Sequence, residues 1–259
     1  MTDSDQLSWR NDDAAETAVL DALAWHALTT EHAHLALGDD RARRYQPDVA
    51  GFVAVVDGSP ESWTSLERIV DPGETIMLSG GTIPSIPASL TSVGGGLGFQ
   101  MWLQQLAAVP VEGPPIRRLE PDDVPRMLAL VELTQPGPFR PRTIELGDYF
   151  GIFDDGELIA MAGERLQTPE FTEVSAVCTH PSARGRGLAA ALSHHVATGI
   201  LARGQIPILH VAKANVGARR VYERLGFVVR RELEFVAVET PAKHPTPDPD
   251  CDEPGTDAP

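Results

Sequence analysis

Polar and apolar residues alternate along residues 171–179, and this alternation predicts a mostly buried strand. Pro181 ends that strand, because proline has no backbone N–H to donate to a neighbour. Residues 184–187, Arg-Gly-Arg-Gly, then form a flexible basic loop. Apolar residues recur at every fourth position from Leu188 to Ile200, which predicts a helix with one buried face. A strand, a glycine-rich turn and a helix in this order direct free backbone N–H groups at an anion such as a phosphate.

The same reading predicts further elements on both sides of this unit. Upstream it gives, in order, a helix over 17–37, a strand over 51–56, a short helix over 61–70 and a strand over 74–78. Glycine-rich stretches at 79–81 and 94–98 are expected to be loops, and periodicity leaves 99–106 open as strand or helix. Downstream it gives strand 116–119, helix 121–133, an irregular loop over 135–141, a hairpin of 150–153 and 158–164, strand 206–211, helix 215–225 and strand 227–238.

The composition predicts two domains, with a polar segment at each end of the chain. Residues 1–16 and the acidic tail 240–259 are expected to be disordered, because they hold few apolar residues. The Pro/Gly-rich segment 110–115 is the best boundary, so residues 17–109 form an amino-terminal α/β domain and residues 116–239 a second domain. The second domain has the order β-α-β-β-β-α-β-α-β.

Charge and cysteine content narrow the class of protein. The formal net charge is −16 and the pI is about 4.8, which argue against general binding to nucleic acid or to an anionic membrane. No apolar run approaches the roughly 20 residues of a membrane span, and the acidic start does not read as a signal peptide. The histidines near the first helix and the two cysteines, Cys178 and Cys251, show no metal-ligand spacing, so no metal is expected. A reducing, cytoplasmic setting is the simplest expectation.

Two short motifs resemble those of the GCN5-related N-acetyltransferase (GNAT) family. Arg184, Gly187 and Ala189 fill the pattern Gln/Arg-x-x-Gly-x-Gly/Ala, which binds acyl-CoA in that family. Residues 215–227 resemble its second pattern, Asn-x-x-Ala-x-x-x-Tyr-x-x-x-Gly-Phe. The wording of residues 175–181, Ser-Ala-Val-Cys-Thr-His-Pro, is similar to the FR47-like branch. The resemblance covers roughly half of the chain.

The resemblance implies a fold and a ligand. The fold is α/β (α+β), a mixed central sheet flanked by helices, and residues 17–109 are expected to be a degenerate acetyltransferase-like half. The ligand is acetyl-CoA, used as co-substrate, whose pantetheine arm would pair with the strand and whose pyrophosphate would bind the loop. The cofactor-binding residues that it implies are Val177, Cys178, Thr179, Arg184, Gly185, Arg186, Gly187, Leu188, Ala189, Asn215, Ala218 and Tyr222.

Two residues are candidates for catalysis. The resemblance implies that Tyr222 is the general acid, and a phenol with an ordinary pKa near ~10 is protonated at neutral pH and can return a proton to a thiolate; its spacing also fits a tyrosine that simply packs in the core. The resemblance also makes Glu173 the candidate general base, because the histone-acetylating branch of the family has its general-base glutamate at the same offset before the first motif; His180 is a rival on the same segment. Asn215 either binds cofactor or caps a helix. Cys178 is expected to be buried and inert.

These residues predict an N-acetyltransferase that transfers acetyl from acetyl-CoA directly to a primary amine of a small molecule or peptide. The alternative is a non-catalytic acyl-CoA-binding regulator or scaffold with the same fold, and transfer of another acyl group such as succinyl is a third reading. Neither nucleic acid nor a membrane is an expected partner. A homodimer is an oligomeric state that the family implies.

Overall fold

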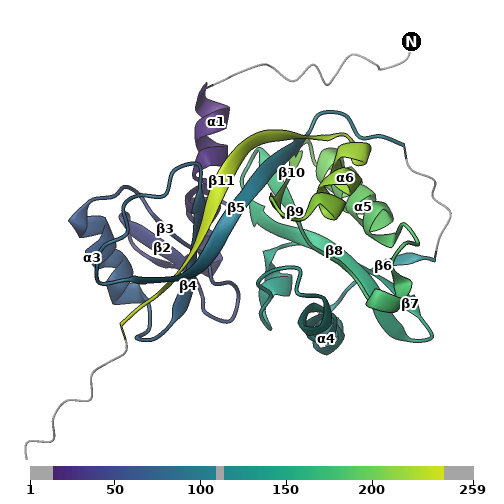
Figure 1. The fold of residues 1–259 in the computed structure, drawn as a ribbon, viewed down its shortest axis with the longest axis horizontal. Coiled ribbons are helices and arrows are strands. Elements are labelled where there is room, and N and C mark those ends of the chain that lie inside the picture. Colours follow the sequence, from purple (N-terminus) through teal and green to yellow (C-terminus); the bar gives the residue numbers. More distant parts are fainter. Residues whose placement is uncertain (1–13, 109–113, 242–259) are drawn as a thin grey trace, which may run out of the picture.

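A computed structural model describes residues 14–108 and 114–241, here called the amino-terminal part and the carboxyl-terminal part. Figure 1 shows them joined by one long sheet, with the helices α4, α5 and α6 around its carboxyl-terminal section and α3 at the opposite end. The sheet has eight strands in the order β4-β11-β5-β10-β9-β8-β7-β6, and a second sheet has three, β1-β2-β3. The fold is therefore the expected mixed sheet flanked by helices.

The amino-terminal part supplies two of the eight strands. Its elements are α1 (Ala14–Asp21), α2 (Leu23–Thr29), η1 (Ala33–Leu35), β1 (Ala36–Gly38), β2 (Ala42–Tyr45), β3 (Val53–Val55), α3 (Pro60–Ile69), β4 (Thr75–Gly80) and β5 (Thr91–Leu103). Ser59 caps α3, since its side chain accepts a bond from the Ser62 N–H and Pro60 follows at the first helical position.

The carboxyl-terminal part confirms the order expected for 116–238. Its elements are β6 (Ile116–Arg118), η2 (Pro121–Asp123), α4 (Val124–Thr134), η3 (Thr143–Leu146), β7 (Tyr149–Asp154), β8 (Glu157–Gln167), β9 (Phe171–Thr179), η4 (Pro181–Ala183), α5 (Leu188–Ala202), β10 (Ile206–Ala212), α6 (Val216–Leu225) and β11 (Phe227–Glu239). Asp155 and Gly156 turn the β7–β8 hairpin with positive φ values of 48° and 85°.

Strand β5 crosses from one part of the chain into the other. It lies antiparallel between β10 and β11, with Val211 opposite Phe99 and Val228 opposite Trp102. Figure 1 shows β5 and β11 running side by side across the middle of the molecule. Strands on both sides of the predicted 110–115 linker therefore share one sheet, while the division into two domains stays a prediction.

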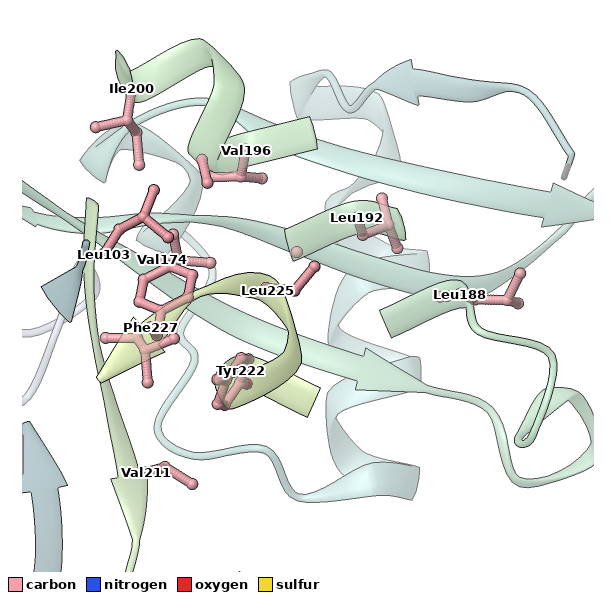
Figure 2. Close-up of a cluster of buried hydrophobic side chains, with 14 of the residues drawn as sticks. Leu103, Val174, Leu188, Leu192, Val196, Ile200, Val211, Tyr222, Leu225 and Phe227 are labelled. Carbon is pink, nitrogen blue, oxygen red and sulfur yellow. The ribbon is translucent and has the colours of Figure 1, made fainter. Parts of the chain in front are cut away.

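A common core accompanies this common sheet. Figure 2 shows Leu103 of β5 beside Phe227 and Val174, in the cluster that also holds the inner face of α5 from Leu188 to Ile200. Leu188, Leu192, Val196 and Ile200 are all nearly inaccessible to solvent, as their spacing predicts. Burying such a side chain contributes roughly 1.5–3 kcal/mol, so both parts stabilise the sheet on which the site is built.

The structure differs from the sequence expectations mainly before residue 108. The helix expected over 17–37 is broken, because α1 ends at Asp21, α2 ends at Thr29, and β1 begins at Ala36. Residues 94–98, expected as a loop, belong to β5. A side-chain Cβ at Gly98 would lie 2.6 Å from Cε2 of Phe235, so glycine is needed there for close strand packing rather than for a turn.

The predicted disordered ends fall largely outside the described residues. Residues 1–13 and 242–259 are not described, whereas residues 14–16 begin α1. Thr240, placed by sequence at the start of the tail, is instead buried, and its hydroxyl donates to the Asp71 carbonyl at 2.5 Å. No helix among the residues described is long and apolar enough to cross a membrane.

Candidate active site

The site begins where two neighbouring strands separate. β9 and β10 are parallel and pair only from Phe171–Ile206 to Glu173–Ile208, after which β10 continues beside β5. From Val174 onward the β9 edge facing β10 therefore has no ladder partner in the described chain. A cavity of about 710 Å³ opens there, here called the cofactor cleft. Unpaired N–H and C=O groups on such an edge can bind an extended, amide-containing ligand as an added strand would.

A β-bulge changes the course of β9 where the strand borders the cleft. The pairing with β8 shifts register between Met161–Cys178 and Gly163–Ser175. Ala176 lies inside this interval with φ of 52°, a left-handed conformation that is rare for a residue with a side chain. Such bulges commonly occur beside active sites, where they redirect a strand. Ser175 to Thr179 all line the cleft, and the Thr179 hydroxyl is buried without a hydrogen-bond partner among the described residues.

The glycine-rich loop leads into the first turn of α5. Gly185 and Gly187 have φ values of 80° and 78°, so both need the conformational freedom of glycine. Gly187 is the residue before the helix, which leaves the N–H groups of the first turn free to bind an anion. Arg184 and Ala189 line the cleft on this side. Arg186 instead contacts Asp154 at 3.2 Å on the surface.

Helix α6 forms the opposite wall. Asn215 caps it, since Oδ1 of Asn215 accepts a bond of 3.1 Å from the Ala218 N–H, and Gly226 ends it with φ of 97°. Asn215, Ala218 and Tyr222 line the cleft. The capping bond accounts for an asparagine at position 215. Because Asn215 also lines the cleft, it can contact a ligand as well.

Tyr222 belongs at once to the core and to the cleft. Figure 2 shows its ring on α6 near Val211 and Phe227, and only 8% of the residue is exposed. Burial, with a smaller contribution from nearby Cys178, raises the pKa of Tyr222 to about 12. The phenol therefore keeps its proton throughout the neutral range and can act as an acid.

The structure gathers many of the predicted cofactor residues into one cavity. Those that line the cleft are Val177, Cys178, Thr179, Arg184, Ala189, Asn215, Ala218 and Tyr222. Gly185, Arg186, Gly187 and Leu188 do not line it: the glycines shape the loop, and Leu188 packs in the core. His180, the rival base, accepts a bond of 3.2 Å from the Ser182 N–H at the start of η4.

Glu173 lies buried at the point where β9 and β10 separate. Its carboxylate accepts from Nε and Nη2 of Arg165 at 2.9 and 2.6 Å, and from Nδ1 of His210 at 2.7 Å. Burial alone would raise the pKa of Glu173, but the positive charge of Arg165 and the bond from His210 outweigh it and hold the pKa well below its ordinary range. The carboxylate is thus ionised and weakly basic, and the structure makes it the partner of two cleft-lining side chains.

Sequence reasoning missed Arg165, His210 and Gln100. Arg165 and His210 line the cleft, and buried Gln100 comes from β5 in the amino-terminal part. Because Oε1 of Gln100 accepts from Arg230 at 2.7 Å, its Nε2 faces Nε2 of His210 at 3.1 Å and donates to it. This network assigns the His210 proton to Nδ1, which donates to Glu173. The pairing of β5 with β10 brings Gln100 to His210, and the pairing of β9 with β8 and β10 brings Glu173 to Arg165 and His210. The network therefore depends on the order of the strands in the sheet, which no local pattern indicates.

Two further observations concern cysteine and possible metal ligands among the described residues. Burial raises the pKa of Cys178 to about 11, so this thiol is not ionised at neutral pH and is a poor nucleophile. No group of three or more His, Cys, Asp or Glu side chains in residues 14–108 and 114–241 is arranged to hold a metal ion.

Comparison with known proteins places this arrangement in a family. A family model described as FR47-like protein matches residues 149–236. The solved structure of an acetyltransferase from the GNAT family of Novosphingobium aromaticivorans DSM 12444 has 34% sequence identity and a TM-score of 0.78, covering 85% of this chain and 98% of that one. The chain belongs to the GNAT family.

Other relatives agree with this GNAT assignment at greater distance. The mycothiol acetyltransferase of Mycolicibacterium gilvum (strain PYR-GCK) is 32% identical over 99 residues, which are 35% of this chain and 33% of that protein. This chain therefore matches about a third of the length of that curated relative. A GCN5-related N-acetyltransferase from Kribbella flavida shares the fold at 18% identity, with a TM-score of 0.59 over 91% of this chain and 98% of that one. These findings agree with the GNAT family assignment and do not favour the non-catalytic alternative.

Proposed function

We propose that this GNAT protein transfers the acetyl group of acetyl-CoA directly to a primary amine. The observation that supports this most is the cofactor cleft itself, in which the free edge of β9, Arg184 beside the first turn of α5, and Tyr222 face one cavity of about 710 Å³. Peptide-like groups of pantetheine match the free strand edge, and a pyrophosphate matches the helix N-terminus and the arginine. The residues present therefore fit the co-substrate that the family implies.

The reaction needs one nucleophile, one leaving group and one proton donor. The neutral amine nitrogen attacks the thioester carbonyl carbon, a C–N bond forms, the C–S bond breaks, and the products are an N-acetyl amide and the free thiol of CoA. Tyr222 gives its proton to the departing sulfur, and the proton that the amine loses replaces it through solvent. Holding both reactants in one cleft supplies a further part of the rate enhancement, because a two-body encounter becomes a reaction within one complex.

Glu173 acts in this proposal mainly through its neighbours. Its oxygens are already held by Arg165 and His210, so it orients both side chains at the end of the cleft. A role as general base requires a water molecule between the carboxylate and the amine, and this stays a prediction. Cytoplasmic location and a homodimer likewise stay predictions.

A transfer assay tests the proposal. The full chain is incubated with acetyl-CoA and a broad set of primary amines, release of the CoA thiol is followed with a thiol reagent, and the acetylated product is identified by mass spectrometry. Acetylated product with a matching amount of released thiol is the expected result. Failure to acetylate any amine by a protein that still binds acetyl-CoA would support the scaffold reading instead.

A further inference from the structure

A second cavity adjoins the cofactor cleft, and binding of acetyl-CoA does not use it. It has a volume of about 310 Å³ and is here called the acceptor cavity. Arg165, His210, Val211 and Ala212 line both cavities, so the two meet at these side chains. Arg165 and His210 contact Glu173 near the start of β9, whereas Arg184 follows the end of that strand. With the pyrophosphate at Arg184, the reacting end of acetyl-CoA would therefore point towards this junction.

The wall of the acceptor cavity is mostly apolar and comes from both parts of the chain. Phe52, Met77 and Leu97 belong to the amino-terminal part, and Pro138 and Phe235 to the carboxyl-terminal part. Its volume lies near the lower end for small-molecule sites, which suits one compact ligand with an apolar group.

Arg165 is the one charged side chain among the described residues that line the acceptor cavity. Its Nε and Nη2 bond Glu173, whereas no described residue bonds Nη1. The guanidinium lies over the ring of Phe52, with Cζ 4.7 Å from the ring centroid, and 12% of the side chain is exposed. One nitrogen of a buried, fixed arginine is thus open at the junction, and such a group binds a carboxylate.

The described lining of the acceptor cavity has no carboxylate that could pair with a bare ammonium group. No aspartate or glutamate is among its described lining residues, and both oxygens of nearby Glu173 accept bonds already. An alkylammonium ion without its own counter-charge would lose hydration there without gaining a partner. An acceptor that brings a carboxylate next to its amine has neither problem.

We propose that the acceptor is a free α-amino acid with a large apolar side chain. Its carboxylate pairs with Nη1 of Arg165, its side chain fills the acceptor cavity, and its α-amine, one carbon away from the carboxylate, lies at the junction with the cofactor cleft. This inference rests on the proposed acetyl transfer and specifies its substrate class.

A matched substrate series tests the carboxylate. The full chain is assayed for kcat/KM with acetyl-CoA and L-phenylalanine, L-phenylalaninamide, phenethylamine or glycine. L-phenylalanine is expected to exceed the amide and phenethylamine by about tenfold or more, because these lack the carboxylate, and to exceed glycine, which lacks the side chain. Equal or faster acetylation of phenethylamine or the amide overturns the inference while leaving acetyl transfer intact. Transfer only to other amines, such as a lysine side chain in a peptide, overturns it as well.

A cavity variant tests the location independently of the polar network. Leu97 lines the acceptor cavity but is 50% exposed, so Leu97→Trp narrows the cavity without disturbing a core position. The substitution is expected to raise KM for L-phenylalanine about tenfold and to leave KM for L-alanine within a factor of two. An equal change for both amino acids, or none for either, contradicts the placement of the side chain.

Discussion

At the scale of single residues, Tyr222 connects packing with chemistry. Its ring is part of the core cluster, while its position on the cleft wall and its raised pKa suit a proton donor. The second motif located this residue from sequence alone, because the spacing of a short helix fixes which side chains share a face. Arg165 and His210 could not be located in this way, because what links them is their shared contact with Glu173, and that contact depends on the order of β8, β9 and β10 in the sheet.

Replacing Tyr222 with phenylalanine should reduce kcat by roughly 10²-fold or more, in the range typical of a lost general acid, and leave acetyl-CoA binding within a few-fold. Tyr149→Phe is the matched control: the Tyr149 hydroxyl is buried without a partner among the described residues and does not line the cleft. That control should keep full activity. The measurement is kcat with both substrates at saturating concentration. If Tyr222→Phe kept its activity, the proton given to the CoA thiolate would come from water and not from Tyr222.

At the scale of elements, the strand and helix pattern after residue 116 could be predicted almost completely. Local signals were strong there: a hairpin turn, an asparagine cap, and a glycine at the end of α6. Before residue 108 the signals misled, because the glycines of β5 resemble loop residues. Their need for close contact with Phe235 depends on β11, which no window of local sequence contains.

His32 joins elements from the two parts of the chain. It precedes η1, accepts a bond from the Tyr45 hydroxyl at 2.8 Å, and donates from Nε2 to the Leu146 carbonyl at 3.1 Å. Burial lowers the pKa of His32 from an ordinary 6.5 to about 4. Between pH 6.5 and about 4, the His32 ring is therefore mostly neutral in the folded protein but mostly protonated in the unfolded chain.

Stability should consequently fall as the pH drops from 6.5 towards 4, by up to about 3 kcal/mol from this residue. Below the folded pKa the loss levels off, because both states then carry the proton. Urea unfolding at several pH values is the measurement, with His32→Gln expected to flatten this slope and exposed His34→Gln expected to keep it. An unchanged slope in His32→Gln would show that other groups cause the acid sensitivity.

At the scale of the whole molecule, β5 makes the carboxyl-terminal part dependent on the amino-terminal part. Removing β5 would leave facing edges of β10 and β11 unpaired and would take Met101 and Leu103 out of the core. It would also remove Gln100 from its contact with His210, and Gly95, Gly96 and Leu97 from the wall of the acceptor cavity.

A piece comprising residues 114–259 should therefore show no cooperative thermal unfolding and no acetyl-CoA binding. Co-expression with residues 1–113 should restore both properties, which serves as the control. Calorimetric scanning and circular dichroism provide the measurement. A cooperative transition in the isolated piece would instead establish the two-domain division that the linker composition predicts.

We propose that acetyl-CoA binds the cleft between β9 and β10, with its pyrophosphate at Arg184 and the first turn of α5. Isothermal titration of the full chain with acetyl-CoA tests it directly, alongside Arg184→Glu and the exposed control Arg68→Glu on α3. We expect one site per chain, about tenfold weaker binding or more in Arg184→Glu, and unchanged binding in Arg68→Glu. No binding by the wild-type protein at ~1 mM acetyl-CoA, a free energy of only about −4 kcal/mol, would contradict it.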